Sequence, residues 1–143
     1  MDPKKLSPGA IVIIAAGALM LIGSFLDFWT IEFFGVSESR NAWSGDTAPG
    51  FPFTIIPVLC GVVMAVHVAL TAFGNVNLPD RLLGFTWSQL HLVLGVQAAI
   101  MMLAMLIQDK DPADPGIGFW LMLLAAIGLV VGAVLREREP AAT

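Results

Sequence analysis

The sequence predicts an all-α integral membrane protein, a bundle of four membrane-spanning helices. Hydrophobic residues make up 57% of the 143 residues and charged residues only 13%, whereas soluble domains have about 45–50% and about 25%. A spanning helix needs about 20 mostly apolar residues. Four stretches of sufficient length contain no Asp, Glu, Lys or Arg: 6–26, 47–79, 82–108 and 115–135. A chain of this length is expected to form a single transmembrane domain, 1–143.

Proline marks the ends of these spans, because it is tolerated at a helix start and disfavoured in a helix interior. Pro8 precedes the first span, Pro52 opens the second, Pro79 follows the second and Pro115 precedes the fourth. We therefore expect spans at about 9–28, 52–73, 86–107 and 116–135. They are joined by outer loops 29–51 and 108–115 and by an inner loop 74–85.

The placement of Lys and Arg predicts the topology. Arg40 and Lys110 fall on one side of the membrane, and the other basic residues fall on the side of both termini and the 74–85 loop: Lys4, Lys5, Arg81, Arg136 and Arg138. By the positive-inside rule, both termini are cytoplasmic. The expected location is a plasma membrane, specifically a bacterial inner membrane. A cleaved signal peptide is the alternative for the first span, but the apolar run continues past Ala16-Gly17-Ala18 and favours an uncleaved helix.

The composition excludes several classes of function. The single cysteine, Cys60, cannot form a redox pair or a cysteine-rich zinc site. The net charge is −4 and no basic stripe is present, so nucleic acid is not an expected partner. No carboxylate lies at mid-span, where proton-coupled transporters usually carry one. No nucleophile constellation or nucleotide-binding loop is found, so we expect no enzymatic activity.

Small residues form stripes that suit helix packing in lipid. The fourth span contains Gly128-Leu-Val-Val-Gly132, and the second carries Gly61, Ala65 and Ala69 at i+4 spacing. We favour packing within the four-helix bundle, and the alternative is an interface with a second copy or another subunit. For Trp29 and Trp43 in the first outer loop, we favour capping of the bundle, and the alternative is contact with a partner.

Two histidines are the candidate ligands of a cofactor. His67 lies near the end of the second span and His91 near the start of the third, so they share a depth on adjacent helices. Such a pair could ligate haem b or hydrogen-bond a quinone. We favour structural roles for both, and a divalent metal site is a third alternative.

We expect structural roles for the other polar residues in the third span and the second outer loop. Gln97, near the middle of the third span, is expected to hydrogen-bond another helix inside the bundle, with the lining of a pathway as the alternative. Asp109, Asp111 and Asp114 in the second outer loop resemble a weak cation site but lack the pattern of a calcium loop. We expect them to be solvated turn residues.

Two short motifs carry a resemblance to known proteins. They are Phe25-Leu-Asp-Phe-Trp29, where the first span ends, and Asn41-Ala-Trp43 in the outer loop. With these motifs and four spans, the chain resembles small four-span integral membrane proteins of actinobacteria. The resemblance implies a four-helix bundle and supplies no active site.

The leading functional hypothesis is a small non-enzymatic membrane protein in contact with the lipid bilayer. It would act as a structural or accessory subunit of a larger membrane complex, or as a homo-oligomer. One alternative is a redox anchor that holds haem b or quinone at His67 and His91. The other is a small oligomeric channel or transporter.

Overall fold

The computed structural model describes residues 7–45, 51–74, 77–79, 81–108 and 113–139. Its helices are α1 (Pro8–Phe25), α2 (Ile56–Phe73), α3 (Trp87–Ile107) and α4 (Ile117–Arg138), with a short 3₁₀ helix, η2 (Phe53–Ile55), leading into α2. All four long helices have the length and composition of a membrane span. The predicted bundle of four long apolar helices is confirmed, and each helix is a candidate membrane span.

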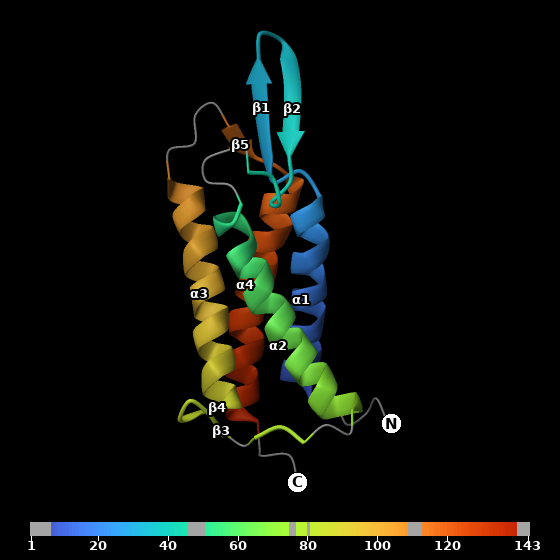
Figure 1. Ribbon diagram of the computed structural model, residues 1–143, viewed down its shortest axis with the longest axis vertical. Helices are drawn as coiled ribbons and strands as arrows, with labels where there is room; N and C mark the ends of the chain where they lie inside the picture. Colours follow the sequence, from blue (N-terminus) through green and yellow to red (C-terminus); the bar gives the residue numbers. More distant parts are fainter. Residues whose placement is uncertain (1–6, 46–50, 75–76, 80, 109–112, 140–143) are drawn as a thin grey trace.

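The four helices run antiparallel to their neighbours along the chain (Figure 1). The start of α1 and the end of α4 meet at one end of the bundle, where the Gly9 amide donates a 2.7 Å hydrogen bond to Glu139 Oε1. A small hairpin, β3 (Arg81–Leu82) and β4 (Phe85–Thr86), lies at this same end. We call it the terminal end, and the opposite end the hairpin end.

Glycines allow the helices to approach closely, because a Cβ at these positions would meet the neighbouring helix. A Cβ on Gly132 would lie 2.7 Å from Ile13 Cγ1 of α1, and one on Gly17 would lie 2.7 Å from the Gly61 carbonyl oxygen of α2. A Cβ on Gly95 of α3 would lie 3.2 Å from the Leu129 carbonyl oxygen of α4. Three helix pairs therefore depend on small residues for their packing, as expected in lipid.

The outer segments expected as loops contain a small antiparallel sheet. Strands β1 (Trp29–Phe33), β2 (Val36–Arg40) and β5 (Ala113–Pro115) pair in the order β2-β1-β5. The β1–β2 hairpin projects beyond the helices along the bundle axis (Figure 1). Its presence also shortens the first span, since α1 ends at Phe25 rather than near residue 28 and the chain turns into β1.

Buried aromatic rings join this sheet to the bundle. Phe28, Trp29 and Phe119 are at most 1% exposed, and their ring centroids lie 4.8 to 5.4 Å apart. The amides of Gly116 and Gly118 donate 2.8 Å hydrogen bonds to the carbonyl oxygens of Phe28 and Asp27. The hairpin is therefore held at its base by both α1 and α4.

The two glycines of the GxxxG motif make different demands on α1, and this difference is testable. A Cβ on Gly128 would lie 3.2 Å from Ala16 Cβ, a milder contact than the one at Gly132. We expect Gly132→Ala to lower the free energy of unfolding by about 1–3 kcal/mol through overpacking, with a smaller effect for Gly128→Ala. Gly45→Ala, where nothing lies within 4 Å, is the control. Unfolding in detergent measures all three, and equal stability of the two GxxxG variants would contradict this packing.

The aromatic cluster at the base of the hairpin can be tested with a pair of tryptophans. Trp29 is 1% exposed, whereas Trp120 of α4 is 48% exposed. Trp29→Ala is expected to lower the free energy of unfolding by about 3–5 kcal/mol because it empties a buried aromatic site. Trp120→Ala should cost much less. Thermal unfolding in detergent compares them, and similar losses would mean that Trp29 does not belong to the core.

Candidate functional site

The two histidines meet inside the bundle. His67 of α2 and His91 of α3 are 7% and 2% exposed, and His67 Nδ1 lies 2.9 Å from His91 Nε2, a hydrogen-bonding distance. The rings are nearly perpendicular, at 81°, with centroids 4.7 Å apart. The side chains expected to be neighbours are therefore in direct contact.

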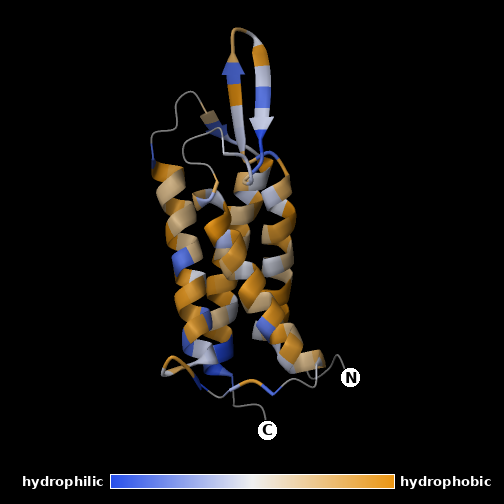
Figure 2. Cartoon of the chain, viewed as in Figure 1, coloured by the Kyte–Doolittle hydropathy of each residue, from blue (hydrophilic) through white to orange (hydrophobic). Residues whose placement is uncertain are grey.

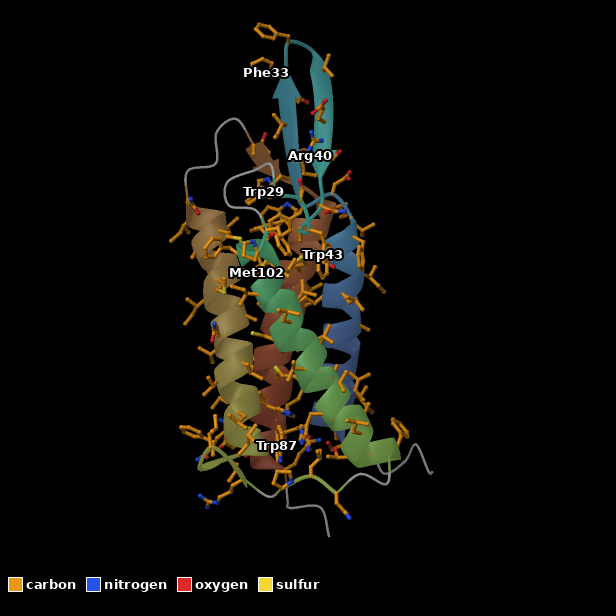
Figure 3. All side chains as sticks on the ribbon, in the orientation of Figure 1. Trp29, Phe33, Arg40, Trp43, Trp87 and Met102 are labelled. Carbon is orange, nitrogen blue, oxygen red and sulfur yellow. The ribbon has the colours of Figure 1, made fainter. Side chains whose placement is uncertain are left out.

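Trp87 packs against His67 of this pair, a contact that the sequence did not reveal. Its ring stacks on His67 with centroids 4.0 Å apart and planes 19° from parallel. Thr86 and Gln89 form a capping box that fixes the start of α3, and Trp87 Nε1 donates a 2.7 Å hydrogen bond to the Pro79 carbonyl oxygen. Figure 3 shows Trp87 at the terminal end, beside the loop that joins α2 to α3. The i, i+4 spacing of Trp87 and His91 was the available signal.

In each histidine of the pair, the ring nitrogen that faces away from the other histidine has no hydrogen-bond partner among the described residues. In a neutral pair one imidazole donates to the other, which leaves one donor and one acceptor nitrogen. These are His67 Nε2 and His91 Nδ1, both buried and without a hydrogen-bond partner among the described residues. Among the described residues, the hydrogen bond between the two rings is a polar contact that joins α2 to α3 inside the bundle.

This geometry does not fit haem b between the two histidines. An iron held by both would separate the nitrogens by roughly 4 Å, twice a typical metal–nitrogen bond of about 2.0 Å, whereas they lie 2.9 Å apart. A groove of about 280 Å³ runs beside His67 and Trp87 and is otherwise lined by apolar side chains. The free His67 nitrogen is buried rather than open to this groove, so in this arrangement of side chains a quinone carbonyl in the groove does not reach it.

The candidate interface residues lie mostly inside the chain's own fold. Gly128 and Gly132 face α1, and Gly61 and Ala65 lie against Gly17 of α1. Ala69 is partly buried on α2. The small-residue faces therefore pack within the bundle, which is the reading that the sequence favoured.

The two candidate tryptophans of the outer loop have structural contacts. Trp29 is buried beneath the hairpin. Trp43 Nε1 donates a 3.0 Å hydrogen bond to Ser24 Oγ, and its ring stacks with Phe25 and Phe51. Both side chains lie near the hairpin end in Figure 3, Trp43 beside α1. They cap the bundle and anchor the segment that follows β2.

The other polar candidates fall outside the bundle interior. Gln97 is exposed on the outer surface of α3, so it does not bond another helix of the same chain as expected. The reason is rotational: α3 is apolar on every side, and the sequence could not show which side faces inward. Asp114 is exposed in β5, while Asp109 and Asp111 lie outside the described residues.

The tip of the β1–β2 hairpin is an exposed apolar surface. It consists of Phe33, Phe34 and Val36, which are 61%, 93% and 61% exposed. Phe34 has φ of 50° and Gly35 has φ of 79°. A two-residue turn with both φ values positive strongly favours Asn-Gly, because bulky side chains are strained in this conformation. A phenylalanine therefore occupies a position where a small polar residue would be more stable.

No protein-family model matches the sequence, and no curated protein matches it significantly. Two features of the structure are unusual for their residue types: the hairpin tip exposes apolar side chains, and the histidine pair buries polar ones.

The histidine pair is expected to act as a connection between α2 and α3. His91→Leu leaves His67 buried and unpaired, so it should lower the free energy of unfolding by about 1–3 kcal/mol. The double variant His67→Leu/His91→Leu should cost less than the sum of the single variants, with a coupling of about 0.6–2 kcal/mol. Unfolding in detergent measures the cycle. Strictly additive losses would show that the hydrogen bond contributes nothing.

Proposed function

We propose that the protein is a non-enzymatic integral membrane subunit that docks a partner protein through the tip of its β1–β2 hairpin. The observation that carries this proposal is the apolar tip, Phe33, Phe34 and Val36, exposed at the end of a projecting hairpin. Aromatic side chains are typical anchors of protein interfaces. The partner is a protein with an apolar pocket in the aqueous layer.

The position of the tip favours a protein partner over lipid. Each strand has five residues, and at about 3.3 Å per residue the hairpin extends roughly 17 Å. The headgroup layer on each side of a bilayer is only about 5–8 Å thick. The hairpin also has a polar stem, with Glu32, Glu38 and Arg40 on its strands and an ion pair of 3.0 Å between the last two. Figure 2 shows hydrophilic segments alternating with apolar ones along these strands.

The backbone conformation of Phe34 supports a functional reason for this residue. A bulky residue at positive φ costs stability, and such outliers gather at binding sites. The β3–β4 hairpin has the same turn, with Leu83 at φ of 54° and Gly84 at φ of 84°. The β3–β4 hairpin lies at the ends of the helices, whereas the β1–β2 hairpin projects beyond them (Figure 1).

The proposed orientation follows from charge. Arg81, Arg136 and Arg138 lie at the terminal end, and Arg40 lies in the hairpin. The positive-inside rule then places the terminal end in the cytoplasm. In a bacterial inner membrane, the hairpin would meet its partner outside the cytoplasm.

The substitution Phe34→Asn separates docking from folding. Asparagine is well suited to positive φ, so the variant should be at least as stable as the wild type. Loss of an aromatic anchor should weaken the complex by about 2 kcal/mol or more, roughly thirtyfold. The measurement is the yield of the partner that crosslinks from a photoreactive residue at Val36 in native membranes, quantified by mass spectrometry.

The matched control is Leu83→Asn, which makes the same kind of change in the same turn conformation at the terminal end. It should leave the crosslinked partner unchanged. If Phe34→Asn keeps the same partner at the same yield, or if Val36 crosslinks only to lipid, the proposal is wrong.

A further inference from the structure

A single polar side chain interrupts the middle of α3. Gln97 has ten residues of the helix on each side, Trp87 to Val96 and Ala98 to Ile107. At 1.5 Å per residue, it lies about 15 Å from each helix end, at the centre of the hydrocarbon layer. Figure 2 shows hydrophilic colour near the middle of α3, between apolar turns, as well as toward the terminal end of the helix.

This side chain points away from the bundle. Gln97 is exposed and borders an apolar groove along α3, together with Leu92, Val93, Val96 and Ile100. Within the part of the chain that the structure describes, its amide forms no hydrogen bond. An amide facing lipid has no water to replace the missing partner, so an unpaired Gln97 at this depth is costly.

The face around Gln97 belongs to the helix that the bundle covers least. Only 28% of the apolar stretch of α3 is buried, against 44% to 50% in the other three helices. Five of the exposed residues follow alternating spacings of four and three, with Val96 and Leu103 exposed beside them: Val93, Gln97, Ile100, Ala104 and Ile107. This is the seam of a left-handed pair of helices, the commonest packing of membrane helices.

We propose that this face of α3 is the interface with α3 of a second copy of the chain, and that the two Gln97 amides pair across it. A primary amide carries both a donor and an acceptor, so it is complementary to itself. Two copies inserted in the same direction and related by a two-fold axis along the membrane normal place Gln97 at the same depth. The Gln97 amide of a second copy can therefore supply both the donor and the acceptor that the first one lacks.

The proposed dimer uses a different surface from the hairpin tip, and it does not depend on docking of a partner there. In coiled coils, one polar residue in an apolar seam fixes the register and the number of helices. Gln97 would have the same effect here, because any shift of one helix along the other would separate the amides. The seam itself contributes apolar packing on both sides of the pair.

The first test measures association in a bilayer. The purified chain, labelled with donor and acceptor fluorophores, is reconstituted in phosphatidylcholine vesicles at a series of protein-to-lipid ratios. Gln97→Leu should weaken dimerisation by about three- to thirtyfold, while Gln97→Asn, which keeps the amide, should retain part of the affinity. Phe34→Asn is the control and should dimerise like the wild type.

The second test locates the interface. In a Cys60→Ala background, Val93→Cys and Ile100→Cys should form disulfide-linked dimers on mild oxidation. Val63→Cys on α2 and Ile127→Cys on α4 are matched controls, since the native residues are 52% and 49% exposed on other helices. These controls should crosslink only weakly.

Three outcomes would overturn the proposal. The wild-type chain could be monomeric in vesicles at all ratios, the Gln97→Leu variant could dimerise with wild-type affinity, or the control positions could crosslink as well as those on α3. A purified monomer whose Val93→Cys variant crosslinks to a different membrane protein in native membranes would assign the face to that protein instead.

Discussion

The close contact between α1 and α4 is the constraint on which the rest of the structure depends. Glycine makes it possible at both ends: Gly132 packs on Ile13 near the terminal end, and Gly118 packs on Gly23 near the hairpin end. The same segment of α4 binds the backbone of Asp27 and Phe28 through two amides. The first and last helices therefore position the base of the hairpin as well as the bundle, and any shift between them would displace both.

The polar side chains of the helices lie in two different environments. His67 and His91 are buried and hydrogen-bond each other, whereas Gln97 carries its amide on the outside of the least covered helix. Phe34 is the opposite case, because it is an apolar side chain that is 93% exposed in the turn of the β1–β2 hairpin. Gln97 and Phe34 both lie on surfaces that the single chain leaves uncovered, one on the side of the bundle and one on the hairpin.

The spans were predictable from sequence because long uncharged runs allow few other structures, and the proximity of His67 and His91 followed from their matched depth. The β1–β2 hairpin was not predictable in the same way. Val36–Arg40 lacks an alternating apolar pattern, and Phe34-Gly35 replaces the usual Asn-Gly turn. The rotation of each helix was also hidden, because helices that are apolar all round show no inward face. Gln97 was therefore expected inside the bundle, and Trp87 was not connected with the histidines.

The pairing of α1 with α4 has a consequence for biosynthesis. Membrane helices are made in order, so α1 is complete while α4 has yet to be synthesised. The β1–β2 hairpin can form from local contacts, but β5 and the amides of Gly116 and Gly118 arrive only with the last helix. Until then the glycine face of α1 is open to other helices in the membrane. Correct folding thus depends on a contact that closes last, and a chain truncated before α4 would present an unfinished surface to the quality-control machinery of the cell.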